Sequence, residues 1–435
     1  MSNVNAGATD PAAIMRMIQA SKAASAAGRS NEADQLLARA AQLAPAHPAV
    51  LNELGLSMLQ RGDARAAREL LQRATQADPN HPALWSNLAS SLQQLELLPE
   101  ALEAVERALA LDPRHLPSLL QKGTLTEQRG DAPNAARVYR NALATLAPGA
   151  TPPASVAGTL EHARTVVAGD DAALAQAIEA RTAPIRARHG AATYRRVERC
   201  IDLLTGKRQR FDSQPTFLYF PEMPALEFFE RSDFPWLDAV EAATDDIRAE
   251  LTSVMVSDRE GLEPYIDYPD GVPLNQWREL NKSRRWSAYF LWNQGAPQPA
   301  HLARCPRTVA ALQQAPRCDI AGRAPTAYFS ILEPATRIPP HTGVANTRLI
   351  VHLPLVVPPG CGFRVGSDTR EWLPGHAWAF DDTIEHEAWN TSDAPRAILI
   401  FDIWNPLLSE AERDLVRAAS EVVASHYGNA AQGPL

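Results

Sequence analysis

The chain has 435 residues, of which 45% are hydrophobic and 21% charged, with a net charge of −8. This length predicts two or three domains, and this composition is globular rather than disordered. Because the net charge is negative, no apolar run reaches roughly 20 residues and the N-terminus shows no secretory signal, we expect a cytoplasmic protein without nucleic-acid or membrane partners.

Residues 1–12 are polar and predict a disordered N-terminus, and residues 13–148 then carry an internal repeat of 34 residues. Copies begin at His47, His81 and His115, and a weaker copy covers 13–46. Small residues recur in phase at Ala33, Ala67, Ala101 and Ala135. The turn position carries Gly28, Gly62, Gly130 and, in one copy, Glu96. A proline ends each second helix because it lacks the N–H and clashes with the preceding turn.

This pattern resembles the tetratricopeptide repeat, and the resemblance implies an N-terminal α-solenoid of stacked helical hairpins. Such a stack docks a peptide or a protein, or serves as a spacer or an oligomerisation arm, and the sequence does not decide between these roles. We interpret the recurring histidines as helix-start residues rather than metal ligands. The oligomeric state is not predicted.

Residues 149–195 predict a linker followed by capping helices, and the composition changes near residue 196. From there to residue 435 the chain is richer in aromatic and β-branched residues, which marks a second domain. The apolar spacing over 234–255 predicts one amphipathic helix, and residues 287–295 predict a strand.

From Ala327 onward, short apolar segments separated by Pro and Gly predict an antiparallel sandwich or barrel. We expect strands within 327–334, 348–357, 362–366, 369–373, 377–382, 386–390 and 396–404. We therefore predict a multidomain α + β chain, whose second domain is a double-stranded β-helix of the jelly-roll or cupin type with flanking helices. The tryptophans of this region are interpreted as core residues.

Polar side chains capable of chemistry cluster in this β region. A lone histidine on a strand is more often structural than a ligand, but His341 closes a strand–turn and His386 follows 45 residues later, with several predicted strands between them. A double-stranded β-helix can bring two such imidazoles together. Arg396 opens a very apolar strand, where a buried cation requires an anionic partner. The pattern thus indicates a metal site beside an anion site, without excluding the structural alternative.

The segments "HTGVANTRLIVHLPL", "FDDTIEHEAWN" and "FDIWNP" resemble the aspartyl/asparaginyl beta-hydroxylase family, and the likeness covers roughly 196–410. It implies a dioxygenase that uses Fe(II), 2-oxoglutarate and O2. By this resemblance His341 and His386 are the catalytic metal ligands, and Arg396, Ser330 and His352 bind the cosubstrate. The residues assigned to the substrate are Arg348, Asp381 and Asp382, although the two aspartates also suit a structural turn.

Two positions depart from common patterns. The third ligand of a two-histidine, one-carboxylate iron site would fall at Gly343, and the resemblance implies that water takes this place. Animal members of the family carry an arginine where this chain has Ile350, so the cosubstrate geometry is an open question.

We accordingly predict a hydroxylase, acting on the β-carbon of Asp or Asn in a peptide or protein docked with help from the repeats. The alternatives are a hydroxylase of a small molecule or lipid, a non-catalytic interaction protein, and a cupin-like metalloenzyme that needs no 2-oxoglutarate.

Overall fold

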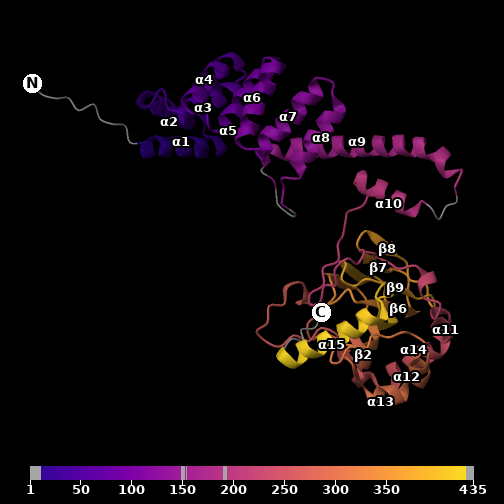
Figure 1. The fold of residues 1–435 in the computed structure, drawn as a ribbon. Coiled ribbons are helices and arrows are strands. Elements are labelled where there is room, and N and C mark those ends of the chain that lie inside the picture. The colour runs from indigo at the N-terminus through magenta and orange to yellow at the C-terminus, as the bar shows by residue number, and fades with distance from the viewer. Residues whose placement is uncertain (1–10, 148–151, 153, 190–193, 428–435) are drawn as a thin grey trace, which may run out of the picture. The chain divides into compact units, whose positions relative to one another are not determined.

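The structure, a computed structural model, describes residues 11–147, 152, 154–189 and 194–427. It divides into two compact units, Met1–Gly206 and Lys207–Leu435, which we consider separately (Figure 1). Most of the expected disordered N-terminus, and residues 149–151, 153 and 190–193 of the expected linker and capping helices, lie outside the described residues. No helix in the described ranges is both long and apolar enough to cross a membrane.

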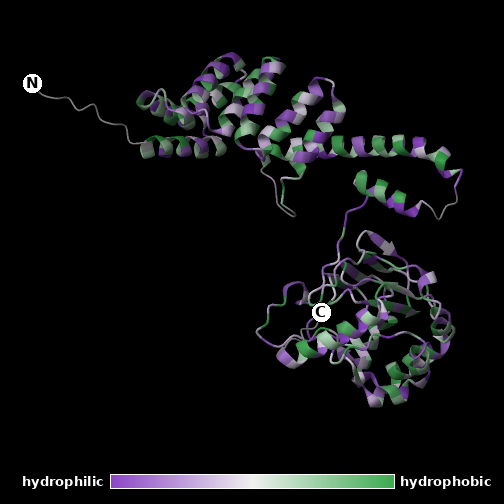
Figure 2. Cartoon of the chain, in the orientation of Figure 1, coloured by the Kyte–Doolittle hydropathy of each residue, from purple (hydrophilic) through white to green (hydrophobic). Residues whose placement is uncertain are grey.

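Four helical hairpins form the first unit. They pair α1 (Pro11–Ala26) with α2 (Ser30–Leu43), α3 (Pro48–Gln60) with α4 (Ala64–Ala77), α5 (Pro82–Gln94) with α6 (Leu98–Leu111), and α7 (Leu116–Gln128) with α8 (Ala132–Leu143). Hydrophobic and hydrophilic residues are interspersed along the helices (Figure 2), and one buried hydrophobic cluster includes Leu71, Leu88 and Val105. The predicted helical stack is confirmed, and His47, His81 and His115 each precede a helix.

Small residues allow the paired helices to approach closely. A Cβ on Gly123 would stand 2.3 Å from Cε1 of Tyr139, and one on Gly55 would stand 2.6 Å from Cγ of Leu71. At the turn position, Gly130 has a φ of 80° and Glu96 adopts a φ of 61°. The backbone conformation of the turn is therefore kept in the copy that lacks glycine, at an energetic cost to Glu96.

Two further helices complete this unit: α9 (Ala154–Arg186) and α10 (Arg195–Leu204). The first part of α9 packs against α7 and α8, where Leu160 and Ala163 are fully buried. The hydrophobic surface of the last hairpin is covered in this way.

Two antiparallel sheets form the second unit. One has the strand order β1-β2-β4-β11-β6-β9 with β3 beside β2, and the other has the order β5-β10-β7-β8. The first contains β1 (Glu263–Pro264), β2 (Trp286–Asn293), β3 (Ala296–Pro297), β4 (Ala327–Leu332), β6 (Arg348–Val356), β9 (Trp378–Phe380) and β11 (Arg396–Trp404). The second contains β5 (Thr336–His341), β7 (Cys361–Val365), β8 (Asp368–Arg370) and β10 (His386–Asn390). The predicted two-sheet class is confirmed.

Sequence reasoning missed β5, because Pro339 and Pro340 argue against a strand. The prolines are tolerated because β5 lies at the edge of its sheet and needs a hydrogen-bonding partner on one side only.

Helices cover one face of the larger sheet, and they are α11 (Leu237–Ala242), α12 (Thr244–Ser257), α13 (Pro299–Arg304) and α14 (Pro306–Leu312). The single helix predicted over 234–255 is wrong, since it breaks at Ala243. There the Thr244 hydroxyl donates to the carbonyl of Glu241 at 2.6 Å and competes with the helical pattern. The chain continues after β11 into α15 (Glu410–Tyr427).

The side chains of alternate residues of β11 pack into two different hydrophobic cores, one on each face of the larger sheet. Leu399 and Phe401 pack toward the helices, whereas Ile398 and Ile400 face the smaller sheet. Arg396 shares the parity of Ile398 and Ile400, so the guanidinium enters the space between the sheets.

Candidate active site

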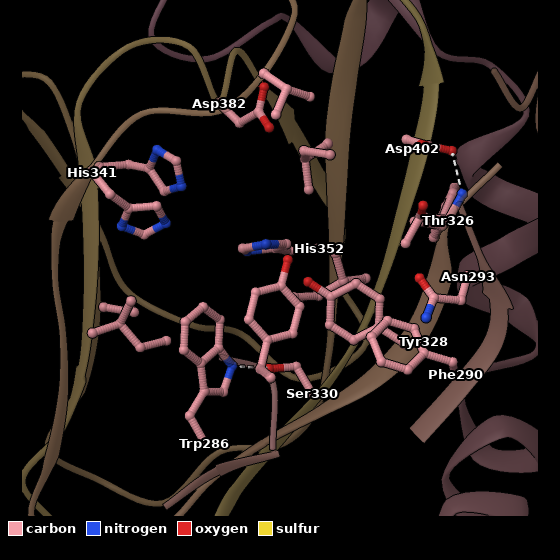
Figure 3. Close-up of a pocket in the computed structure, with 18 of the residues that line it drawn as sticks. Trp286, Phe290, Asn293, Thr326, Tyr328, Ser330, His341, His352, Asp382 and Asp402 are labelled. Atoms are coloured by element: carbon pink, nitrogen blue, oxygen red, sulfur yellow. Dashed lines mark hydrogen bonds between the residues drawn. The ribbon is translucent and has the colours of Figure 1, made fainter. Parts of the chain in front are cut away.

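A cavity of about 300 Å³ opens between the two sheets. Its polar lining comes from both sheets, and Figure 3 shows His341, His352 and Asp382 facing a common space beside Trp286 and Ser330. Of the eight residues predicted for the site, seven line this cavity: Ser330, His341, Arg348, His352, Asp382, His386 and Arg396.

His341 and His386 lie side by side, at the last residue of β5 and the first residue of β10. They are directly paired in the register of β5 and β10, and their ring centroids are 4.1 Å apart. Nδ1 of His341 lies 2.8 Å from the carbonyl of Pro339, and Nδ1 of His386 lies 3.0 Å from that of Ile384. Each Nδ1 therefore carries the proton, and each Nε2 keeps its lone pair for another partner.

Burial keeps both imidazoles neutral. It lowers the pKa of His341 to about 4, and burial together with the neighbouring His341 lowers the pKa of His386 well below its ordinary value. Neutral imidazole is the form that binds metals. Among the described residues, no group of three or more His, Cys, Asp or Glu is placed to hold a metal ion.

Arg396 is 2% exposed and lines the same cavity. Within the described residues no carboxylate forms an ion pair with it, and the guanidinium instead lies 5.4 Å from the ring centroid of Trp372. Burial lowers the pKa of Arg396 to about 10, so the side chain is still a cation at neutral pH. A buried cation in a cavity wall is a strong site for an anionic ligand.

Two further side chains complete the polar wall near Arg396. The indole Nε1–H of Trp286 donates to Oγ of Ser330 at 3.1 Å, which leaves the Ser330 hydroxyl proton free to point into the cavity. His352 is buried, and its Nδ1 has no hydrogen-bonding partner in the described structure. Ile350 lies on the same face of β6 between Arg348 and His352 and lines the cavity.

Arg348 forms a buried network with two carboxylates. Nη1 donates to Asp402 at 2.9 Å, and Nη2 lies 3.5 Å from Asp382. Burial opposes the charge of Arg348, but Asp382 and Asp402 outweigh it and raise its pKa. Burial also raises the pKa of Asp402 to about 6, against the effect of Arg348. Arg348 is thus neutralised by the chain itself, in contrast to Arg396.

Gly343 and Asp382 share one space. A Cβ at position 343 would stand 2.1 Å from Oδ2 of Asp382. The carboxylate of Asp382 therefore fills the volume in which a side chain at 343 would lie, and Oδ1 is buried without a hydrogen-bonding partner in the described structure. The sequence identified the missing acid at 343 but not the acid that occupies its place.

Asp381 does not line the cavity. Its Oδ1 accepts hydrogen bonds from the backbone N–H of Thr383 at 3.0 Å and from its hydroxyl at 2.6 Å, in the turn that leads into β10. Burial raises the pKa of Asp381 to about 7.

Sequence reasoning missed the roles of Tyr265, Tyr328, Trp372 and Asp402 in the cavity wall. Asp402 had a detectable signal, since it is an acid inside an otherwise apolar strand. Tyr265 had none, because it reaches the cavity from a loop outside the predicted β region.

Two antiparallel sheets that enclose paired histidines and an unneutralised arginine define a jelly-roll protein with a metal-compatible site. Residues 241–406 match the family Aspartyl/Asparaginyl beta-hydroxylase, and residues 58–122 match the Tetratricopeptide repeat. The chain therefore contains one region similar to the aspartyl/asparaginyl beta-hydroxylase family and another similar to tetratricopeptide repeats.

Relatives of the second unit are named hydroxylases. The chain is 35% identical to the ornithine lipid ester-linked acyl 2-hydroxylase of Rhizobium tropici over 42% of its length and 62% of the relative. It is 36% identical to the human aspartyl/asparaginyl beta-hydroxylase over 35% of its length and 20% of the relative. The human aspartate beta-hydroxylase domain-containing protein 2 is 28% identical, over 46% of this chain and 53% of the relative. The chain thus spans between a fifth and about three fifths of these relatives.

One of the similar solved structures is a repeat protein. A thermophilic TPR protein from Thermus thermophilus covers 37% of this chain and 89% of its own, with 21% identity and a TM-score of 0.32.

Proposed function

We propose that the second unit is an Fe(II)- and 2-oxoglutarate-dependent dioxygenase that hydroxylates an unactivated carbon. The observation that carries the proposal is Arg396, a fully buried cation without a carboxylate partner in the described chain, in the same cavity as His341 and His386. A metal site and an anion site in one enclosed cavity suit an organic diacid that chelates the metal.

The donor set fits Fe(II). Two neutral imidazoles, each held by a backbone carbonyl at Nδ1, offer Nε2 atoms of borderline softness. The carboxylate of Asp382 fills the side-chain space of Gly343, and it would be available to hydrogen-bond water if a metal were bound by the two histidines.

The remaining polar atoms fit 2-oxoglutarate. Arg396 and the hydroxyl of Ser330 bind the distal carboxylate. The hydrogen bond from Trp286 to Oγ of Ser330 orients that hydroxyl. His352 lines the same cavity and is assigned to the chelating end by the family resemblance, and Ile350 contributes apolar surface in place of a second cation. The bound iron and 2-oxoglutarate supply the activation of O2 and the hydroxylation. The chain binds and orients the reactants and excludes water.

The substrate we infer is a peptide or protein, hydroxylated at the β-carbon of Asp or Asn. The tetratricopeptide repeats support this inference, because stacked hairpins of this kind commonly dock peptides. The name of the relative from Rhizobium tropici supports the second candidate, a lipid.

Succinate formation tests the reaction class. The full-length protein, with Fe(II), ascorbate and 2-oxoglutarate, should form succinate, and His386→Ala should not. Stabilisation by 2-oxoglutarate or its oxalyl analogue in a thermal scan, present only with metal, gives an independent measurement. A metal-dependent protein that neither binds 2-oxoglutarate nor forms succinate would support the cupin-like alternative, and the absence of metal binding would support the interaction protein.

The substrate class needs a separate search. Peptides and lipid extracts from cells with and without the protein should be compared by mass spectrometry for the addition of one oxygen. Oxygen addition confined to lipids would contradict the peptide assignment while leaving the reaction class intact.

A further inference from the structure

Two buried tryptophans lie together between the sheets, in the segment that links β8 to β9 and at the start of β9. Trp372 and Trp378 are each 8% exposed, and their ring centroids are 4.8 Å apart. The indole Nε1–H of each is buried, and neither has a hydrogen-bonding partner in the described chain. Buried donors in folded proteins are nearly always paired, so both N–H groups require an explanation.

The two residues differ in one respect. Trp372 lines the cavity, whereas Trp378 is absent from its lining. The ring of Trp372 stacks on His352, with centroids 5.5 Å apart and planes at 18°, and the guanidinium of Arg396 lies 5.4 Å from the ring centroid. Trp372 thus belongs to the same cavity wall as Arg396, and Trp378 does not.

An indole N–H donates and never accepts, so its partner must supply an oxygen lone pair. A carboxylate has about four lone-pair positions and can accept from a guanidinium, a hydroxyl and an indole at once. An anion that pairs with Arg396 would approach the guanidinium within about 3 Å, which brings it beside the ring of Trp372.

We propose that Trp372 is a further recognition residue for the cosubstrate, and that its Nε1–H donates to the carboxylate that pairs with Arg396. This inference rests on the proposed function. It assigns to Trp372 a binding contact in addition to its packing in the core.

The test compares Trp372→Phe with Trp378→Phe in the full-length protein. Both changes keep an aromatic ring and remove one unpaired buried N–H, so Trp378→Phe is the matched control. Binding of 2-oxoglutarate is measured by calorimetry with Zn²⁺, which has no redox chemistry, in place of iron. Trp372→Phe should weaken binding about 10- to 100-fold, as expected for the loss of one bond to a charged acceptor, and Trp378→Phe less than about twofold.

A second ligand locates the contact. 2-Oxopentanoate keeps the chelating end of 2-oxoglutarate but lacks the distal carboxylate. Wild type and Trp372→Phe should bind it equally. An equal loss with both ligands would overturn the proposal, because Trp372 would then act at the chelating end or through packing alone.

The wild-type protein provides a readout that does not depend on the folding of a variant. With ¹⁵N-labelled indoles and Zn²⁺, one buried Nε1–H resonance should move downfield on addition of 2-oxoglutarate but not of 2-oxopentanoate. Trp372→Phe assigns this resonance if it folds. Wild-type affinity in Trp372→Phe, or no resonance that responds to 2-oxoglutarate alone, would refute the role of Trp372 while the proposed function stands. A wild-type protein that does not bind 2-oxoglutarate would refute both.

Discussion

Replacing Arg396 with methionine should make the ligand-free protein more stable and abolish cosubstrate binding. The cation is buried without an ion-pair partner in the described chain, and burial lowers its pKa to about 10. Since each pH unit in a pKa corresponds to about 1.4 kcal/mol, this burial costs the folded unit about 3 kcal/mol at neutral pH. The sign follows because a lowered pKa of a base means that folding disfavours its charged form.

Part of this gain is offset in the variant. The variant loses the cation–π contact between Arg396 and the ring of Trp372, which stabilises the folded wild type by about 0.5–1 kcal/mol. A net gain of about 2 kcal/mol should raise the melting temperature of a unit of this size by about 4–8 °C. Calorimetry of the full-length protein measures this change in melting temperature. The unfolding transition of the second unit is identified as the one that 2-oxoglutarate and metal shift in the wild type. The shift itself should vanish in Arg396→Met.

Arg348→Met is the matched control, because both arginines line the same cavity. Arg348 is paired with Asp382 and Asp402, so its removal leaves two buried carboxylates and should cost about 3–5 kcal/mol. The two variants should therefore change the melting temperature in opposite directions. A lower melting temperature in both variants would show that Arg396 is neutralised in the ligand-free protein. If 2-oxoglutarate still stabilised Arg396→Met, the binding role of Arg396 would be refuted.

Three more predictions concern the histidines, the third ligand position and the repeats. Because burial lowers the pKa of His341 to about 4 and that of His386 also falls, Zn²⁺ affinity should change less than about twofold from pH 7.5 to pH 6.0. Two histidines with ordinary pKa values would lose roughly tenfold, which calorimetry distinguishes. Gly343→Ala should destabilise the second unit by about 1–3 kcal/mol in thermal scans, because the new Cβ collides with Asp382. In a protein that already carries Asp382→Ala the same change should cost much less, because the new Cβ then has space, and additive effects would show that the two side chains do not share space. Glu96→Gly should stabilise the repeats by up to about 1 kcal/mol in urea unfolding, since Glu96 has a φ of 61°, whereas Gly130→Ala should destabilise them. If Glu96→Gly and the wild type were equally stable, the positive φ of Glu96 would not destabilise the turn.

Local pattern made much of this architecture predictable. The 34-residue period marks the hairpins because each repeat must bury its own helix faces against the next, so the same positions stay small in every copy. The strands of the second unit were visible where their residues are uniformly apolar, as in β11. They were not visible in β5, where an edge position tolerates prolines that a central strand would exclude.

The amino-acid sequence by itself determined the repeat stack, the two-sheet class and seven of the residues that surround the cavity, because periodicity and residue type are local properties. Only the tertiary structure decided which charges are neutralised. Arg348 and Arg396 stand at the ends of two apolar strands, yet one meets Asp402 and Asp382 while the other meets no carboxylate in the described chain. That difference depends on strand register and on side chains that are distant in the sequence, and it is the reason we propose Arg396 as the anion site.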